Sequence, residues 1–136
     1  MQYKVSSTGT IKSFTDLVAW QEAHRLAVEI YKTTKSFPAE EQYGLVAQMR
    51  RAAVSVTSNI AEGFSRSTAA EKANFYSVAL GSITELQNQI LLCRDVDLLS
   101  KDIFSTLAEK SVTVHKLISS LMKAIRSGKG IRAKPA

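Results

Sequence analysis

Apolar residues recur every three or four positions along almost the whole chain, and this spacing limits the fold more than any other feature. It is the period of an amphipathic α-helix, which turns one face toward a core every 3.6 residues. The alternation of period two that marks strands is not sustained, and the Asn-Gly and Asp-Gly pairs that close β-hairpins are absent from the sequence. The sequence therefore predicts an all-α protein.

Two helices are expected in the first half of the chain. The first begins at Ser13, with Asp16 placed almost as in a capping box, and continues to about residue 35. Phe37-Pro38 ends it, because proline disfavours a helical conformation in the residue before it. The second is expected over residues 41–62, with Gly63 as a left-handed cap at its C-terminus.

Two more helices are expected in the second half. Thr68 and Glu71 form a capping box that opens a helix reaching about residue 95. Ser100 can cap a fourth helix, which Gly128 ends. The connections are short, about four to eight residues, so consecutive helices are expected to be antiparallel and to form an up-down-up-down four-helix bundle.

The length of the chain fits one domain, and the pattern predicts its limits. Residues 1–12 are expected to be a flexible N-terminal segment and residues 13–127 the bundle. Residues 128–136, rich in glycine and lysine, are expected to be a flexible basic tail.

The net charge of +6 is concentrated at the two ends of the chain. Residues 1–12 and 126–136 carry basic side chains and no acidic ones, whereas residues 13–125 are neutral by count. Clustered Lys and Arg bind phosphates by displacing counterions, which makes nucleic acid, RNA or DNA, a candidate partner. The candidate contact residues are Lys4, Lys12, Arg50, Arg66, Lys123, Arg126, Lys129, Arg132 and Lys134.

A polar stripe also runs along the second expected helix, and a second one on the third helix includes Glu85; if the two faces oppose each other, they form one network. The members on the second helix are Gln48, Arg51, Ser55, Asn59 and Glu62. Charges buried between helices must be paired, so Arg51 is expected near Glu85 in a structural network. Glu62 ends a helix, where the helix dipole disfavours negative charge. It therefore needs a donor, from Arg66, from Lys72, or from the backbone amides that begin the third helix.

The apolar faces of the first and third helices look wider than one bundle core requires, which suggests self-association. The candidate interface residues are Leu17, Trp20, Tyr31, Tyr76 and Leu80. The alternative is that these large side chains simply line the edge of the core.

Catalytic patterns are weak in this sequence. His24 and His115 lie on different helices among apolar residues, as packed histidines do, and neither belongs to the Glu-x-x-His motif of di-iron bundles. The lone cysteine, Cys93, has apolar neighbours and no base beside it, as expected for a buried thiol. We expect no enzyme activity, no cofactor and no metal.

The expected location is the cytoplasm. One cysteine cannot form an internal disulfide, and the N-terminal residues do not have the apolar core of a signal peptide. No apolar run approaches the roughly 20 residues of a membrane span.

The order of these motifs resembles the four-helix bundle protein family first named for proteins encoded in intervening sequences of bacterial large-subunit ribosomal RNA genes. The resemblance covers about residues 13–122 and is carried by residues 14–20, 37–38, 43–45, 48–63 and 81–86. It implies a left-handed up-and-down bundle and a ring-like homopentamer. Thr57 stands where family members commonly have proline, which removes an expected kink in the second helix.

The resemblance extends more distantly to accessory proteins of diversity-generating retroelements, basic pentamers that associate with a reverse transcriptase and nucleic acid. Two functions remain open. The chain is either a non-enzymatic oligomer that associates with RNA or DNA through clustered basic residues, or a scaffold that binds a protein, for example a reverse transcriptase, without touching nucleic acid.

Overall fold

The computed structural model of the chain describes residues 10–128, and nearly all of them are helical. The elements are η1 (Phe14–Asp16), α1 (Val18–Thr34), η2 (Ala39–Glu41), η3 (Gln42–Val46), α2 (Ala47–Ser65), α3 (Ala69–Asp95) and α4 (Lys101–Ser127). No strand occurs among the described residues. This confirms the prediction of an all-α four-helix bundle.

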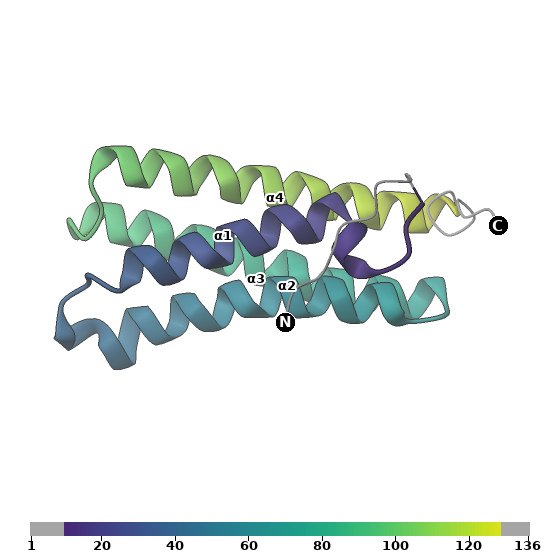
Figure 1. The fold of residues 1–136 in the computed structure, drawn as a ribbon, viewed down its shortest axis with the longest axis horizontal. Coiled ribbons are helices and arrows are strands. Elements are labelled where there is room, and N and C mark those ends of the chain that lie inside the picture. The colour runs from purple at the N-terminus through teal and green to yellow at the C-terminus, as the bar shows by residue number, and fades with distance from the viewer. Residues whose placement is uncertain (1–9, 129–136) are drawn as a thin grey trace.

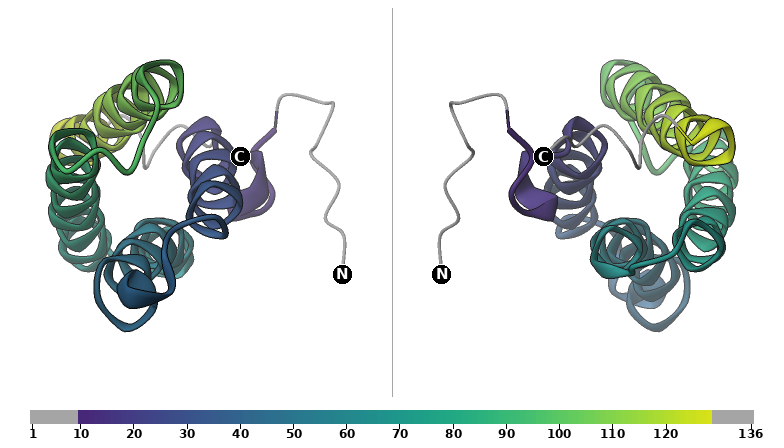
Figure 2. Two further views of the ribbon diagram at one scale, coloured as in Figure 1. Left: turned by 90° about the vertical axis from the view of Figure 1, so that its left-hand side faces the viewer. Right: turned by 90° about the vertical axis from the view of Figure 1, so that its right-hand side faces the viewer.

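The four long helices lie side by side, and successive helices run in alternating directions (Figure 1). The starts of α1 and α3 and the ends of α2 and α4 therefore meet at one end of the molecule, which we call the terminal end. Both ends of the described chain lie there, and the view along the bundle in Figure 2 (right) looks onto it. The opposite end is called the distal end.

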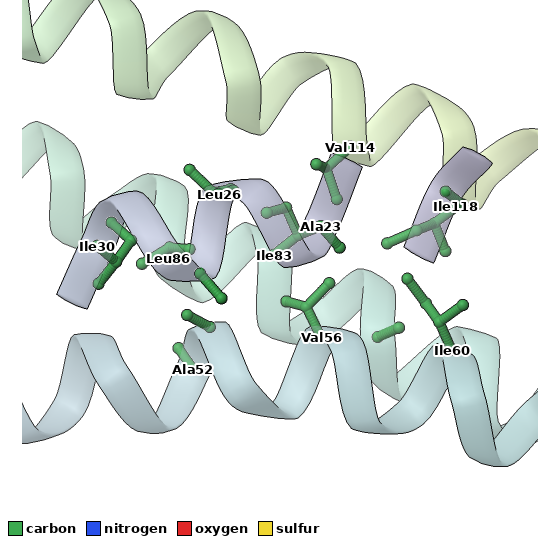
Figure 3. Packing of buried hydrophobic residues seen from close by; sticks show 14 of the residues in the cluster. Ala23, Leu26, Ile30, Ala52, Val56, Ile60, Ile83, Leu86, Val114 and Ile118 are labelled. Carbon is green, nitrogen blue, oxygen red and sulfur yellow. The ribbon is translucent and has the colours of Figure 1, made fainter. Parts of the chain in front are cut away.

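The core is a continuous layer of aliphatic side chains from all four helices (Figure 3). Ile30, Ile60, Ile83, Leu86 and Ile118 are each inaccessible to solvent. Burial of a side chain of this size contributes about 1.5–3 kcal/mol, so the core accounts for most of the stability of the bundle.

Helix capping follows the sequence closely at four positions. The Ser13 hydroxyl accepts from the Thr15 amide at 3.1 Å, while the Asp16 carboxylate accepts from the Ser13 amide at 3.3 Å. Thr68 and Ser100 cap α3 and α4 through hydroxyls that accept backbone amides. Gly128 ends α4 with a left-handed φ of 79°. The expected starts of the third and fourth helices, and the expected end of the fourth, are confirmed.

The first expected helix is interrupted near its start. Leu17 adopts an extended conformation, with ψ of 127°, between the short helix η1 and α1. The Gln21 side chain donates to the Thr15 carbonyl at 2.8 Å across this break. The capping signal at Ser13 was read correctly, but it opens a single 3₁₀ turn and not the long helix.

The second expected helix was wrong at both ends. A 3₁₀ turn and a π-helical turn, η2 and η3, precede α2, which begins only at Ala47. Gly63 is not the cap: it lies inside α2, is buried, and packs beneath the Tyr76 ring. A Cβ at this position would lie 2.5 Å from Tyr76 Cε1, so glycine is required for close helix packing and not for a left-handed turn.

Candidate nucleic-acid interface

Arg50 is committed to contacts within the bundle. Its Nε donates to Thr34 Oγ1 at 3.0 Å and its Nη2 to the Tyr31 carbonyl at 3.2 Å, and its guanidinium lies 4.5 Å from the centre of the Tyr31 ring. These groups sit at the C-terminus of α1, where carbonyls lack helical partners and the dipole favours a cation. Arg50 therefore caps α1 and is a poor candidate for binding phosphate, contrary to the sequence prediction.

Arg66 is similarly engaged. Its Nη2 contacts Glu62 Oε2 at 2.6 Å, and its guanidinium lies 4.7 Å from the centre of the Phe75 ring. Arg66 is thus the donor that the position of Glu62 called for. Lys72, the other side chain considered, instead donates to the carbonyls of Gly63 and Phe64 at 3.3 and 2.7 Å.

Other basic side chains at the terminal end are not engaged in this way. Lys12, Lys123 and Arg126 are exposed, and their side chains form no hydrogen bond or ion pair with any described residue. Lys4, Lys129, Arg132 and Lys134, also predicted to bind nucleic acid, lie outside the described residues.

Lys116, which was not among the residues predicted to bind nucleic acid, belongs with these free cations. It is exposed on α4 seven residues before Lys123, so the two side chains lie on the same side of the helix, about 10 Å apart along its axis. An excess of positive charge in this part of the chain is visible in the sequence. Glu109 is the last acidic residue, and after Lys110 six further lysines or arginines follow, from Lys116 to Lys134.

The carboxylates of the terminal end are already occupied. Asp16 accepts the backbone amides of Lys12 and Ser13, and Glu71 accepts the Thr68 hydroxyl at 3.1 Å. Glu62 is paired with Arg66. None of these carboxylates forms an ion pair with Lys12, Lys116, Lys123 or Arg126, and these four cations outnumber the three carboxylates, so they add to the positive potential of this end.

The expected polar network forms in separate pieces, and the piece that holds Arg51 and Glu85 lies at the surface. Arg51 Nη2 lies 3.2 Å from Glu85 Oε2 and also bonds Gln48. Their side chains are 61% and 40% exposed, so this pair is screened by water and contributes little to stability. The Arg51–Glu85 pairing is confirmed, and its expected burial is wrong.

The other members of the network lie further along the same two helices. The Ser55 and Ser82 hydroxyls are 2.7 Å apart, and the Asn59 side-chain amide donates to the Ser55 carbonyl at 2.8 Å. The bond between Ser55 and Ser82 joins α2 to α3 and supports their register, whereas the Asn59 bond lies within α2.

The candidate self-association residues are mostly used within the bundle. Tyr76 is only 3% exposed and is therefore a core residue, which corrects its assignment to an interface. Leu17, Trp20 and Leu80 are partly buried against the core. Tyr31 alone of the five is exposed, and Arg50 covers one face of its ring.

Burial also separates the groups considered for chemistry. Cys93 is fully buried, as predicted, and burial together with the charge of Glu41 raises the pKa of its thiol to about 11. His24 is exposed and stacked on Trp20, which corrects its expected place among packed side chains. Within residues 10–128 no three His, Cys, Asp or Glu side chains gather as metal ligands would.

One open hollow of about 320 Å³ lies between α1 and α4, near the distal end. Its lining includes two carboxylates, Glu29 and Asp102, and two threonine hydroxyls, and nothing in it resembles a nucleophile paired with a base. No helix of the described chain is long and apolar enough to cross a membrane.

The sequence profile of the 23S rRNA-intervening sequence protein family matches residues 15–120. The chain belongs to this family. The predicted resemblance is therefore confirmed. No curated protein is significantly similar to the chain.

A solved structure has the same fold. It is the crystal structure of a protein of unknown function from the S23 ribosomal protein family of Bacteroides thetaiotaomicron. The similarity has a TM-score of 0.73 at 22% sequence identity, and covers 80% of this chain and 98% of that chain.

Proposed function

We propose that this member of the 23S rRNA-intervening sequence protein family is a non-enzymatic, self-assembling bundle that associates with nucleic acid through its terminal end. The observation that carries the proposal is the row of free cations on the second half of α4. Lys116, Lys123 and Arg126 are exposed there, and no acidic residue follows Glu109 in the chain. Lys12 adds a further cation at the same end.

The chemistry of these cations favours phosphates over bases as their ligands. Lysine ammonium groups on a convex helix form point charges without a fixed hydrogen-bonding pattern. Such a surface binds the backbone of RNA or DNA by releasing counterions and does not read base edges. Association is therefore expected to be sensitive to salt and only weakly dependent on sequence.

The test compares single charge removals at the two ends of the bundle. Lys116→Gln and Lys123→Gln are expected to weaken the binding of a labelled RNA, measured by fluorescence anisotropy, and to flatten the slope of log affinity against log salt by about 0.7–0.9 per lost contact. Lys32→Gln and Lys101→Gln, exposed at the distal end, are matched controls and should change little. Equal losses at both ends would refute the location, and undiminished affinity in the α4 variants would refute the contact.

Self-assembly is proposed to use the outer face of α3. Besides its core residues, this helix carries large apolar side chains on the side that faces away from the bundle, and exposed apolar side chains of this kind can mark a contact surface. Val78, Leu91 and Leu92 are 52%, 44% and 48% exposed. Between them Gly81 is exposed, with no atom within 4 Å of where a Cβ would be, so no contact within the bundle explains a helical glycine at this position.

This surface predicts the behaviour of one pair of variants. Val78→Glu should reduce the mass measured by light scattering from that of an oligomer toward that of one chain. The family resemblance implies that this oligomer is a ring of five chains. Val112→Glu on α4, where Val112 is 45% exposed, is the matched control and should leave the mass unchanged. A wild-type chain that is already monomeric would contradict self-assembly, and the α3 face would then favour the scaffold function, with a different protein as its partner.

A further inference from the structure

An aromatic stack stands on α1, apart from the row of cations on α4. The His24 and Trp20 rings are nearly parallel, with an interplanar angle of 15° and centroids 4.7 Å apart. Phe14 meets the Trp20 ring edge to face at 5.2 Å. The three rings form a column that η1 and the first turns of α1 hold together.

Trp20, in the middle of the column, is held in place by the core, and His24, at its end, is exposed to solvent. Trp20 is partly buried and packs against the core, so its ring is fixed in orientation. His24, one helical turn further along, is exposed and lies flat on the indole. No second aromatic ring of the described chain lies against His24 besides Trp20. The imidazole therefore offers a flat, pre-oriented aromatic surface to the solvent.

We infer that the His24–Trp20 stack is a platform on which an unpaired base of single-stranded nucleic acid lies. The inference rests on the proposed function and adds to it a class of partner: strands with unstacked bases, in preference to duplexes. Base stacking on aromatic side chains needs no sequence-specific hydrogen bond, because every base has a π-face.

The electrostatic surroundings favour this occupant. The stack lies about 9 Å along the axis from the start of α1, in the half of the bundle that bears the free cations. Arg25 is adjacent to His24, and its only described partner is Glu22, in an exposed pair with side chains 60% and 31% accessible. An exposed pair of this kind is weak, so Arg25 can turn toward a phosphate at little cost.

A second copy of the chain fits this surface less well. Covering His24 with an apolar helix would strip water from two ring nitrogens without giving them partners, which is unfavourable. A stacked base covers only the face of the imidazole and leaves its nitrogens at the edge in water. The proposed self-association surface on α3 lies across the bundle from α1 (Figure 2), so assembly and stacking do not compete.

The experiment uses the full chain and its only tryptophan, Trp20, as the reporter. A short single-stranded oligoadenylate, and the same strand paired to its complement, are each titrated while Trp20 emission and the anisotropy of the labelled strand are recorded. The single strand should change Trp20 emission as it binds, and the duplex should not do so at equal saturation. His24→Ala should weaken the single strand about fivefold or more and leave the duplex unchanged.

Two further variants make the test specific. His24→Phe restores a flat ring without the ring nitrogens and should recover single-strand affinity, whereas His115→Ala, on α4, is the control for loss of a histidine. Circular dichroism of each variant checks that the bundle is intact.

Binding seen by anisotropy, with Trp20 emission unchanged and His24→Ala equal to wild type, would overturn the stacking platform and leave the proposed function standing. Absence of any binding would overturn both. A lower oligomer mass in His24→Ala without nucleic acid would assign the stack to a contact between copies and would also refute the inference.

Discussion

Gly63 and Gly81 are both helical glycines, yet their surroundings differ completely. A Cβ at Gly63 would lie within 2.5–2.8 Å of the Tyr76 ring and 3.1 Å from Phe75 Cβ, whereas a Cβ at Gly81 would meet no atom within 4 Å. The first glycine allows α2 and α3 to approach each other. The second only lowers helix propensity in the single bundle.

This contrast predicts opposite effects of the same substitution. Gly63→Ala should lower the free energy of unfolding by about 1–3 kcal/mol, because a rigid buried ring must move. Gly81→Ala should raise it by about 0.4–1 kcal/mol through reduced freedom of the unfolded chain. Urea denaturation of both variants, at a protein concentration low enough to leave single chains, measures the difference, and a destabilised Gly81→Ala protein under that condition would contradict the open surroundings of Gly81 within the bundle.

Two buried titratable side chains make the bundle sensitive to alkali. Burial raises the pKa of Tyr76 from 10.0 to about 12, and burial with the charge of Glu41 raises the pKa of Cys93 from 9.0 to about 11. The unfolded chain therefore ionises first, and the free energy of unfolding should fall as the pH rises from about 9 to 12.

Urea midpoints across this range should fall less steeply above pH 10 for Tyr76→Phe than for the wild-type chain. Tyr43→Phe, at a tyrosine that is 94% exposed, should keep the wild-type slope, and identical slopes in both variants would contradict the account.

The C-termini of α1 and α2 are each capped by a basic side chain from the next helix in the chain. Arg50 of α2 reaches the end of α1, and Lys72 of α3 reaches the carbonyls that end α2. Each contact adds a donor to carbonyls in the last turn of a helix and favours the antiparallel arrangement of consecutive helices. Basic residues in the body of the bundle thus contribute to its fold.

Adjacent arginines test this role. Arg50→Met should lower the free energy of unfolding by about 1–2 kcal/mol, because a hydrogen bond to the Tyr31 carbonyl, one to Thr34 and the ring contact are lost together. Arg51→Met is the matched control, since its pair with Glu85 is exposed, and should change stability by at most about 0.5 kcal/mol. Chemical denaturation measures both, and equal effects would contradict the capping role.

Features of the fold with a local cause could be predicted from the sequence, and those with a tertiary cause could not. Ser13, Thr68, Ser100 and Gly128 were read correctly, because a cap depends on residues within one turn. Gly63 was misread, because the approach of Tyr76 from α3 is not visible in the sequence around it. The break at Leu17 was missed for a similar reason, since a side-chain bond from Gln21 crosses it.

The candidate site shows the same division. The excess of positive charge at the end of the chain could be counted from the sequence. The sequence does not show which arginines are free, because Arg50 and Arg66 lie over a tyrosine and a phenylalanine ring that belong to other helices. The stack of His24 on Trp20 depends on rotamers, so the spacing of four residues only permitted it.

For the whole molecule, the two ends of the bundle differ in what they offer. The terminal end gathers both ends of the described chain, the free cations of α4 and the aromatic stack of α1. The distal end has the hollow lined by Glu29 and Asp102, whose negative charge offsets that of the exposed Lys32 and Lys101 at the same end. Nucleic acid is therefore expected to approach along one axis, with the α3 face left for assembly.

The most direct test of this account is the salt dependence of RNA binding by the full chain. Anisotropy titrations at several salt concentrations, with the oligomer mass checked by light scattering, give the slope of log affinity against log salt. The four free cations at the terminal end of each bundle, at about 0.7–0.9 per contact, predict a slope of roughly −3 or steeper. A slope near zero, or the absence of binding by a well-formed oligomer, would contradict the central claim that the basic terminal end binds nucleic acid.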